Sequence, residues 1–100
     1  MDDETWVDLT DRFVDGDVTA GHMFGCAGLR TGRRFFAIRW HGQLVVKLSP
    51  ARLAQLVEGG DGRPFEPMEG RRMNGWLLLR APEWDSLVTE ARAHVEAQQK

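Results

Sequence analysis

The sequence predicts an α+β fold of two layers, in which one antiparallel sheet carries its helices on a single face. Apolar residues recur at helical spacing near both ends of the chain. Between them lie short stretches of alternating polar and apolar residues, separated by tight glycine turns that can only join antiparallel strands. We therefore expect the order helix, three or four strands, helix, one strand, helix.

Size and composition limit the class of protein. The chain has 100 residues, which indicates a single domain over residues 1–100, and 42% hydrophobic residues are enough for a packed core. The formal net charge of −2 does not favour general nucleic-acid binding. No apolar run approaches the ~20 residues of a membrane span, and the acidic start is unlike a signal peptide, so we expect a cytoplasmic protein without membrane contact.

The first half of the chain predicts one helix and a meander of strands. The helix covers residues 3–14, and strands are expected over 19–24, 33–40 and 43–48. Gly25 to Gly28 suggests a bend or bulge between the first two strands, because only small residues fit there. Thr31-Gly32 and His41-Gly42 are the expected hairpin turns.

Strict alternation within 33–40 assigns its side chains to two faces. One face receives Phe36, Ile38 and Trp40, and the other receives Phe35, Ala37 and Arg39.

The second half predicts a short helix, a loop, a strand and a long helix. Ser49 can cap the short helix before Pro50, and Gly59-Gly60 ends it. Residues 61–70 contain two prolines and are expected to form a loop, whereas 71–80 is expected to form a strand with an apolar centre. The last helix opens at Pro82 and places an apolar stripe on one face.

Several local motifs resemble those of a known bacterial family, the TfoX (Sxy) amino-terminal domain. Its signature positions in this chain are Met23, Phe24, Gly25, Gly28, Leu29, Gly32 and Phe36. Similarity continues through the strand ending Val46-Lys47-Leu48 and covers residues from about 6 to 95. We interpret these signature residues as structural, with Phe24 and Leu29 in the core and glycines that permit the bend.

The resemblance implies a secretion-chaperone-like α/β fold and a regulatory role through protein contacts, with a transcription factor of the cyclic-AMP receptor type as the suggested partner. Two departures stand out. Cys26 occupies a position where the family commonly has a second glycine, and the named competence regulators carry a further helical domain that this 100-residue sequence lacks.

Cys26, His22 and His41 are the candidates for metal or thiol chemistry. On one strand, His22 and Cys26 would lie four residues apart and point to one side unless the Gly25 bend intervenes. No CxxC or HExxH spacing accompanies them, and no oxyanion motif does. We therefore expect no cofactor, no metal and no enzymatic activity, with Cys26 as a small apolar core residue.

Arginines form the most specific candidate site. Arg30, Arg33 and Arg34 flank the Thr31-Gly32 turn, while Arg71 and Arg72 open a later strand. If that strand lies beside the hairpin, five guanidinium groups meet, with Phe35 and Trp40 as stacking surfaces. The alternative interpretation is that these arginines only keep strand ends soluble.

These observations leave three hypotheses. The favoured one is a regulatory protein–protein interaction domain that docks a partner, or a second copy, through a sheet edge or face at Arg30, Arg33, Arg34, Arg71 and Arg72, with Trp40 as a hot spot if exposed. The alternative is direct nucleic-acid binding through the same arginines. The third is a thiol- or metal-dependent activity at Cys26.

Overall fold

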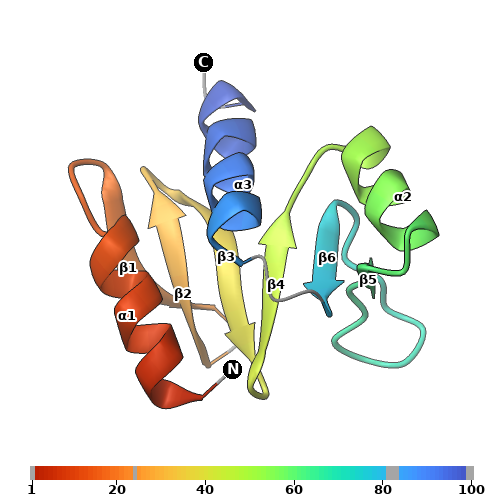
Figure 1. Cartoon of the computed structure of the whole chain (residues 1–100), viewed down its shortest axis with the longest axis horizontal. Coiled ribbons are helices and arrows are strands. Elements are labelled where there is room, and N and C mark those ends of the chain that lie inside the picture. Colours follow the sequence, from red (N-terminus) through yellow and green to blue (C-terminus); the bar gives the residue numbers. More distant parts are fainter. Residues whose placement is uncertain (1, 24, 81–83, 99–100) are drawn as a thin grey trace.

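The fold is known from a computed structural model, which describes residues 2–23, 25–80 and 84–98. In chain order the described elements are α1 (Asp3–Phe13), β1 (Val18–Met23), β2 (Cys26–Thr31), β3 (Arg34–Trp40), β4 (Gln43–Lys47), α2 (Pro50–Glu58), β5 (Gly62–Pro64), β6 (Trp76–Leu79) and α3 (Trp84–Gln98). The strands form one antiparallel sheet in the order β1-β2-β3-β4-β6-β5 (Figure 1). The predicted α+β class is confirmed.

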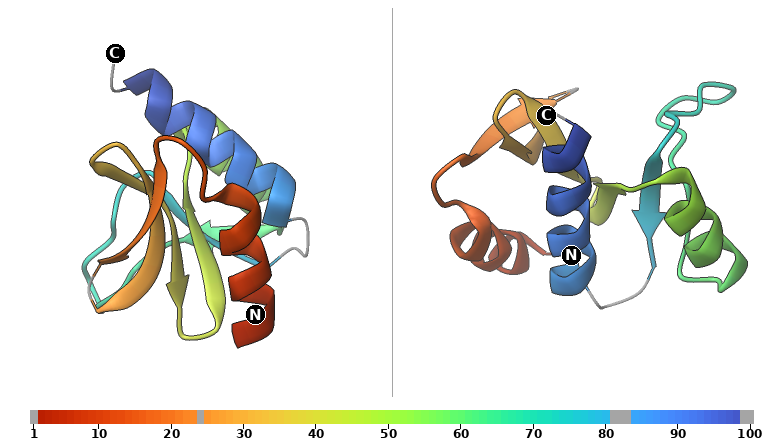
Figure 2. Two further views of the ribbon diagram at one scale, coloured as in Figure 1. Left: turned by 90° about the vertical axis from the view of Figure 1, so that its left-hand side faces the viewer. Right: turned by 90° about the horizontal axis from the view of Figure 1, so that it is seen from above.

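The helices cover one face of the sheet. Figure 2 shows α1 and α3 on the same side, and α2 beside α3 near the β5 edge. Leu9 of α1, Leu56 of α2 and Val88 of α3 belong to a single buried cluster with Leu29 and Leu77 of the strands. We call the opposite face, which none of the described helices covers, the open face.

Local sequence explains where the first two helices begin. Asp2 caps α1 by accepting a 2.8 Å hydrogen bond from the Thr5 N–H. Hydrogen bonding from the Thr5 side chain and, to a lesser extent, from this N–H holds the pKa of the Asp2 carboxyl below its usual value. Ser49 caps α2 by accepting from the Arg52 N–H at 3.3 Å, and Pro50 occupies the first turn. The cap predicted at Ser49 is therefore confirmed.

A β-bulge in β3 makes the predicted alternation wrong. Leu29 pairs with Ala37 and Arg30 pairs with Phe35, so that Phe36 is an extra residue in its strand. Phe36 consequently joins Ala37 in the cluster under the helices, whereas Phe35 packs with the cluster on the open face. The two phenylalanines thus exchange the faces that strict alternation assigned to them.

The predicted bend at residues 25–28 is instead a tight hairpin turn followed by a regular strand. Gly25 lies in the turn with φ of +74°, which only glycine adopts without strain. Gly28 has ordinary extended geometry in β2, and its constraint is steric. A Cβ there would lie 2.9 Å from the Ala37 carbonyl oxygen and 2.9 Å from Cδ1 of Phe35. Gly28 therefore leaves room for the Phe35 ring. The next turn contains Gly32 and Arg33, because Thr31 is the last residue of β2.

The region after α2 also differs from the prediction. Residues 62–64, expected as loop, form β5, while β6 covers only 76–79 of the predicted strand 71–80. β4 separates β6 from β3, so the strand that follows Arg72 does not lie beside the β2–β3 hairpin. The sheet has β1 as one edge and the three-residue β5, ending in Pro64, as the other.

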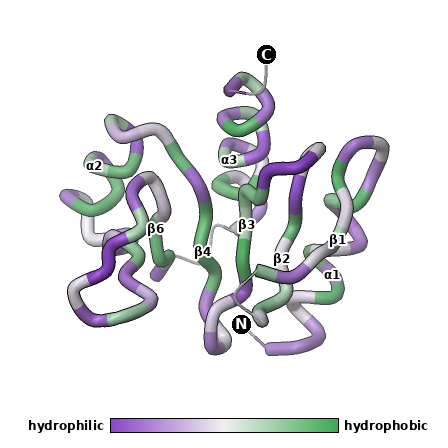
Figure 3. Tube along the Cα trace, turned by 180° about the vertical axis from the view of Figure 1, so that it is seen from behind, coloured by the Kyte–Doolittle hydropathy of each residue, from purple (hydrophilic) through white to green (hydrophobic). Residues whose placement is uncertain are grey.

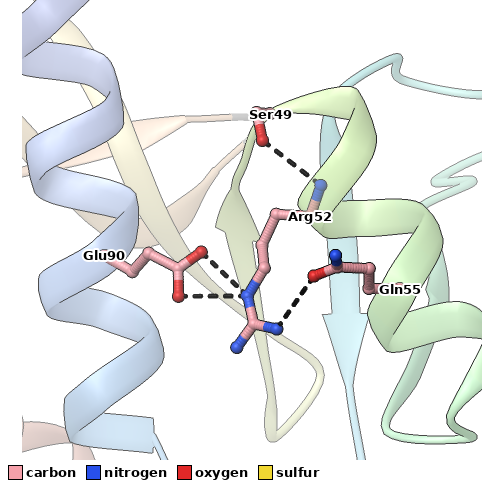
Figure 4. Close-up of polar contacts among 4 residues, drawn as sticks. All are labelled: Ser49, Arg52, Gln55 and Glu90. Atoms are coloured by element: carbon pink, nitrogen blue, oxygen red, sulfur yellow. Dashed lines mark hydrogen bonds and ion pairs between the residues drawn. The ribbon is translucent and has the colours of Figure 1, made fainter.

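Arg52 ties α2 to α3, two helices that lie 38 residues apart at this contact (Figure 4). Its Nε donates to both carboxylate oxygens of Glu90 at 3.1 and 3.0 Å, and a terminal nitrogen donates to Gln55 at 3.3 Å. Near the C-terminal end of α3, Thr31 of β2 donates to Glu96 at 3.1 Å. These contacts fix α3 across the strands from both sides.

Candidate functional site

The open face carries a second apolar cluster without a helix above it. Its buried members are Ile38, Val45, Phe65, Trp76 and Leu78. Around them lie apolar side chains that remain half-buried: Met23, Cys26, Phe35, Trp40 and Met73. Figure 3 views the sheet from this side and shows that β3 and β4 contain mainly hydrophobic segments, whereas strongly hydrophilic residues lie near the β2–β3 turn.

The charges on the sheet have one sign. The six described strands contain no Asp or Glu but five basic residues: Arg30, Arg34, Arg39, Lys47 and Arg63. Arg30 pairs in register with Phe35, Lys47 with Trp76, and Arg63 with Leu78, which places these three side chains on the open face.

Acidic residues gather on the other side of the molecule. Seven carboxylates lie within the first seventeen residues, on α1 and its flanking segments: Asp2, Asp3, Glu4, Asp8, Asp11, Asp15 and Asp17. Because α1 packs on the helix-covered face, the near-neutral total charge conceals an uneven distribution of carboxylates and basic side chains.

One hollow brings apolar and basic groups together. It has a volume of about 260 Å³ and is lined by Met23, Phe35 and Trp76 together with Arg33, Arg34 and Lys47. Val95 and Gln98 of α3 complete its wall, so it lies where the open face meets the end of the last helix. We call it the basic hollow.

Within the basic hollow, the Lys47 ammonium group is positioned by two contacts. Its Nζ donates to the Asn74 carbonyl at 3.2 Å and lies 5.7 Å from the centre of the Trp76 ring, within cation–π range. The hollow therefore contains one positioned cation and two exposed arginines, Arg33 in the adjacent turn and Arg34 at the start of β3.

The five arginines of the predicted patch do not form a single cluster. Arg33 and Arg34 line the basic hollow, and Arg30 lies on the open face, where its Nε donates to Thr19 at 3.1 Å. Arg71 and Arg72 lie in the segment before β6, and Arg72 lines a separate hollow of about 390 Å³ with Leu53 and Met73.

In the described part of the chain, none of these five arginines lies within ion-pair distance of a carboxylate, unlike Arg12, Arg39, Arg52 and Arg92. Their charges are thus available to a partner.

Trp40 is half-buried rather than exposed. Its ring meets His41 and Phe65 edge-on, with centroid distances of 4.6 and 5.2 Å. It lines a third, polar hollow of about 210 Å³ with Arg63 and Glu66. It contributes part of its surface to the open face.

The structure separates the candidate residues for thiol or metal chemistry. Met23 pairs with Cys26 and His22 pairs with Ala27, so that Cys26 lies on the open face and His22 lies on the helix-covered face. Within residues 2–23, 25–80 and 84–98, no three His, Cys, Asp or Glu side chains gather as metal ligands do. His22 and Cys26 therefore do not share one side, because the turn at Gly25, which the sequence left open as the exception, puts them on different strands.

Among the signature residues, Leu29 and Phe36 are fully buried under the helices, and Gly32 forms a turn with φ of +61°. Met23 lines the basic hollow, which the structural interpretation of the signature missed. The expected core position of Phe24 lies outside the described residues. Lys47 and Trp76 were also missed, although their alternation with Val45 and Leu78 is visible in the sequence.

Comparison with known families decides the relationship. The chain matches the TfoX N-terminal domain over residues 8–97. It belongs to the TfoX N-terminal domain family. No match was found among curated proteins or among solved structures. None of the described helices of this TfoX domain has the length and apolar character needed to cross a bilayer.

Proposed function

We propose that this TfoX N-terminal domain is a non-enzymatic, cytoplasmic regulatory module that acts by binding a protein partner through its open face. The observation that carries the proposal is the basic hollow, where half-buried apolar side chains adjoin arginines that form no ion pair with any described carboxylate. Protein interfaces commonly combine such an apolar centre with a polar rim in which arginine is enriched. The family membership supports a regulatory or competence-related role.

The test is quantitative capture of partners from a lysate of the source organism, with nuclease present. The tagged chain is compared with the double variant Arg33→Glu/Arg34→Glu. The matched control is Arg80→Glu, because Arg80 is also exposed but follows the far end of β6, about 13 Å along the strand from Trp76.

The proposal predicts at least one protein that the wild-type chain and Arg80→Glu capture and the double variant does not. Equal recovery by all three chains would place any partner elsewhere on the molecule and refute the proposed surface.

Direct nucleic-acid binding is the second candidate, favoured by the arginines that have no carboxylate within ion-pair distance in the described chain. It predicts that captured material disappears on nuclease treatment and that affinity for a duplex falls steeply with salt, since bound phosphates release counterions.

A further inference from the structure

We infer that the basic hollow receives an acidic amphipathic peptide segment of the partner, with an apolar side chain on the hollow floor and carboxylates toward Arg33, Arg34 and Lys47. This inference rests on the proposed function and specifies the chemistry of the partner. It starts from three properties of the hollow, namely its charge, its apolar floor and its volume.

The charge of the hollow selects an anion. Arg33, Arg34 and Lys47 are the charged residues of its lining, and none is paired with a carboxylate in the described chain. The strands beneath contain no acidic residue. A basic or neutral segment would gain nothing from these cations, whereas an acidic one is both attracted and oriented by them.

The floor of the hollow requires an apolar group beside the anions. Met23 and Phe35 are half-buried members of the open-face cluster, with no helix to cover them. The Phe35 ring is already held in place, because it lies against Gly28 and Gly21. A preformed apolar contact of this kind accepts a side chain with little loss of conformational freedom.

The size of the hollow favours a peptide over a small metabolite. Its volume of about 260 Å³ is below the ~300–1,000 Å³ of typical small-molecule pockets, which enclose most of their ligand. One or two side chains of a longer segment fit such a site, while the rest of the segment contacts the surrounding open face.

The aromatic residues of the hollow argue against single-stranded nucleic acid. Base stacking requires an accessible ring face. Trp76 is only 6% exposed and carries Lys47 above its ring, so its ring faces are not accessible to a base. Phe35 lies against Gly21 and Gly28 with one face and offers at most its other face. The hollow therefore lacks the row of stacking platforms that successive bases need.

The experiment is fluorescence anisotropy with the full chain and a defined probe. The probe is a fluorescein-labelled 15-residue peptide with Leu and Phe on one helical face and Glu at the other positions. Two control peptides replace either every Glu by Gln or the apolar residues by Ala, and a labelled 15-nucleotide oligothymidine tests nucleic acid. The protein variants are Arg33→Glu/Arg34→Glu, the milder Arg33→Gln/Arg34→Gln, and Arg80→Glu.

The inference predicts that both control peptides bind at least about tenfold more weakly than the probe. Affinity for the probe also falls at least about tenfold in Arg33→Glu/Arg34→Glu and by a smaller factor in Arg33→Gln/Arg34→Gln, whereas Arg80→Glu retains wild-type affinity. Binding should weaken between 0.1 and 1 M salt, where the Debye length falls from ~10 to ~3 Å.

Absence of probe binding, equal binding by all variants, or tighter binding of oligothymidine would each overturn the inference. The outcome remains separable from that of the proposed function. A lysate protein whose capture needs Arg33 and Arg34, together with no binding of the acidic probe, would retain the surface and reject the acidic segment.

Discussion

Replacing Gly28 by alanine tests the packing that shapes the basic hollow. The new Cβ would lie 2.9 Å from the Ala37 carbonyl oxygen, 2.9 Å from Cδ1 of Phe35 and 3.0 Å from its Cε1. Ordinary contacts between carbon atoms are about 3.5–4.0 Å, so the ring must move by about 0.5–1 Å. The carbonyl belongs to the β2–β3 ladder and cannot move alone.

The expected change in the free energy of unfolding follows from two opposing effects. Overpacking costs about 1–3 kcal/mol, whereas replacing glycine stabilises by about 0.4–1 kcal/mol through the unfolded chain. We expect a net loss of about 1–2 kcal/mol in the free energy of unfolding. For a domain of this size the melting temperature should fall by about 4–16 °C.

Urea unfolding followed by tryptophan fluorescence provides the assay. The graded control is Gly21→Ala, whose Cβ would meet only side-chain atoms, the nearest being Cζ of Phe35 at 3.1 Å. Gly21→Ala should therefore lower the free energy of unfolding clearly less than Gly28→Ala does. In a Phe35→Ala background Gly28→Ala should also cost less, which a double-mutant cycle measures. A Gly28→Ala chain as stable as the wild type would refute both the ring position and the bulge at Phe36.

Three further predictions concern other parts of the chain. Arg52→Ala should lower the free energy of unfolding, measured in urea, by about 0.5–1 kcal/mol, because both side chains of the Arg52–Glu90 pair are 39% exposed. Arg12→Ala should lower it by less, because the Arg12–Asp85 pair is more exposed. Asp2→Ala should lower the helicity measured by circular dichroism at neutral pH. Folding lowers the pKa of the Asp2 carboxyl, so the ionised carboxylate stabilises α1 fully above the ordinary pKa of Asp and loses this effect as the pH falls through the lowered pKa. The helicity of Asp2→Ala should therefore change less with pH in the acid range than that of the wild type. Cys26→Ser should cost about 1 kcal/mol, because it puts a hydroxyl into a half-buried apolar cluster, and should leave partner capture intact; unchanged stability with lost capture would reinstate a thiol function.

Local patterns were sufficient to predict the helices and most of the meander. Ser49 and Pro50 predict the start of α2, and the helical spacing of apolar residues predicts α1, because both signals depend on residues that are close in the sequence. The glycine turns likewise identified the antiparallel order.

Features that depend on a neighbouring strand were not predictable in this way. The bulge at Phe36 shifts the alternation by one residue, and only the partner strand β2 reveals it. β5 contains glycine, arginine and proline, without any apolar pattern, and exists because β6 offers an edge to pair with. The expected cluster of five arginines failed for the same reason, since strand order is a non-local property.

The site was predictable in part. Arg33 and Arg34 were predicted as docking residues from their position at a turn, and the structure places both in the lining of the basic hollow. Their role in docking stays a prediction. Lys47 and Trp76 lie 29 residues apart, and their contact arises only from the β4–β6 pairing. The spacing of residues along the chain could therefore not predict that Lys47 and Trp76 line the same hollow as Arg33 and Arg34.

The unequal edges of the sheet limit how copies of this domain can assemble. At the β5 edge, three residues ending in proline leave little backbone for another strand. At the β1 edge, the N–H and carbonyl groups that point away from β2 belong to Val18, Ala20 and His22. Those of Val18 already bond to Asp15, so those of Ala20 and His22 remain for pairing with another strand. A molecule with one usable edge can join a second copy symmetrically, but that pairing consumes the edge of both. Growth of an extended cross-strand polymer therefore stops at two chains.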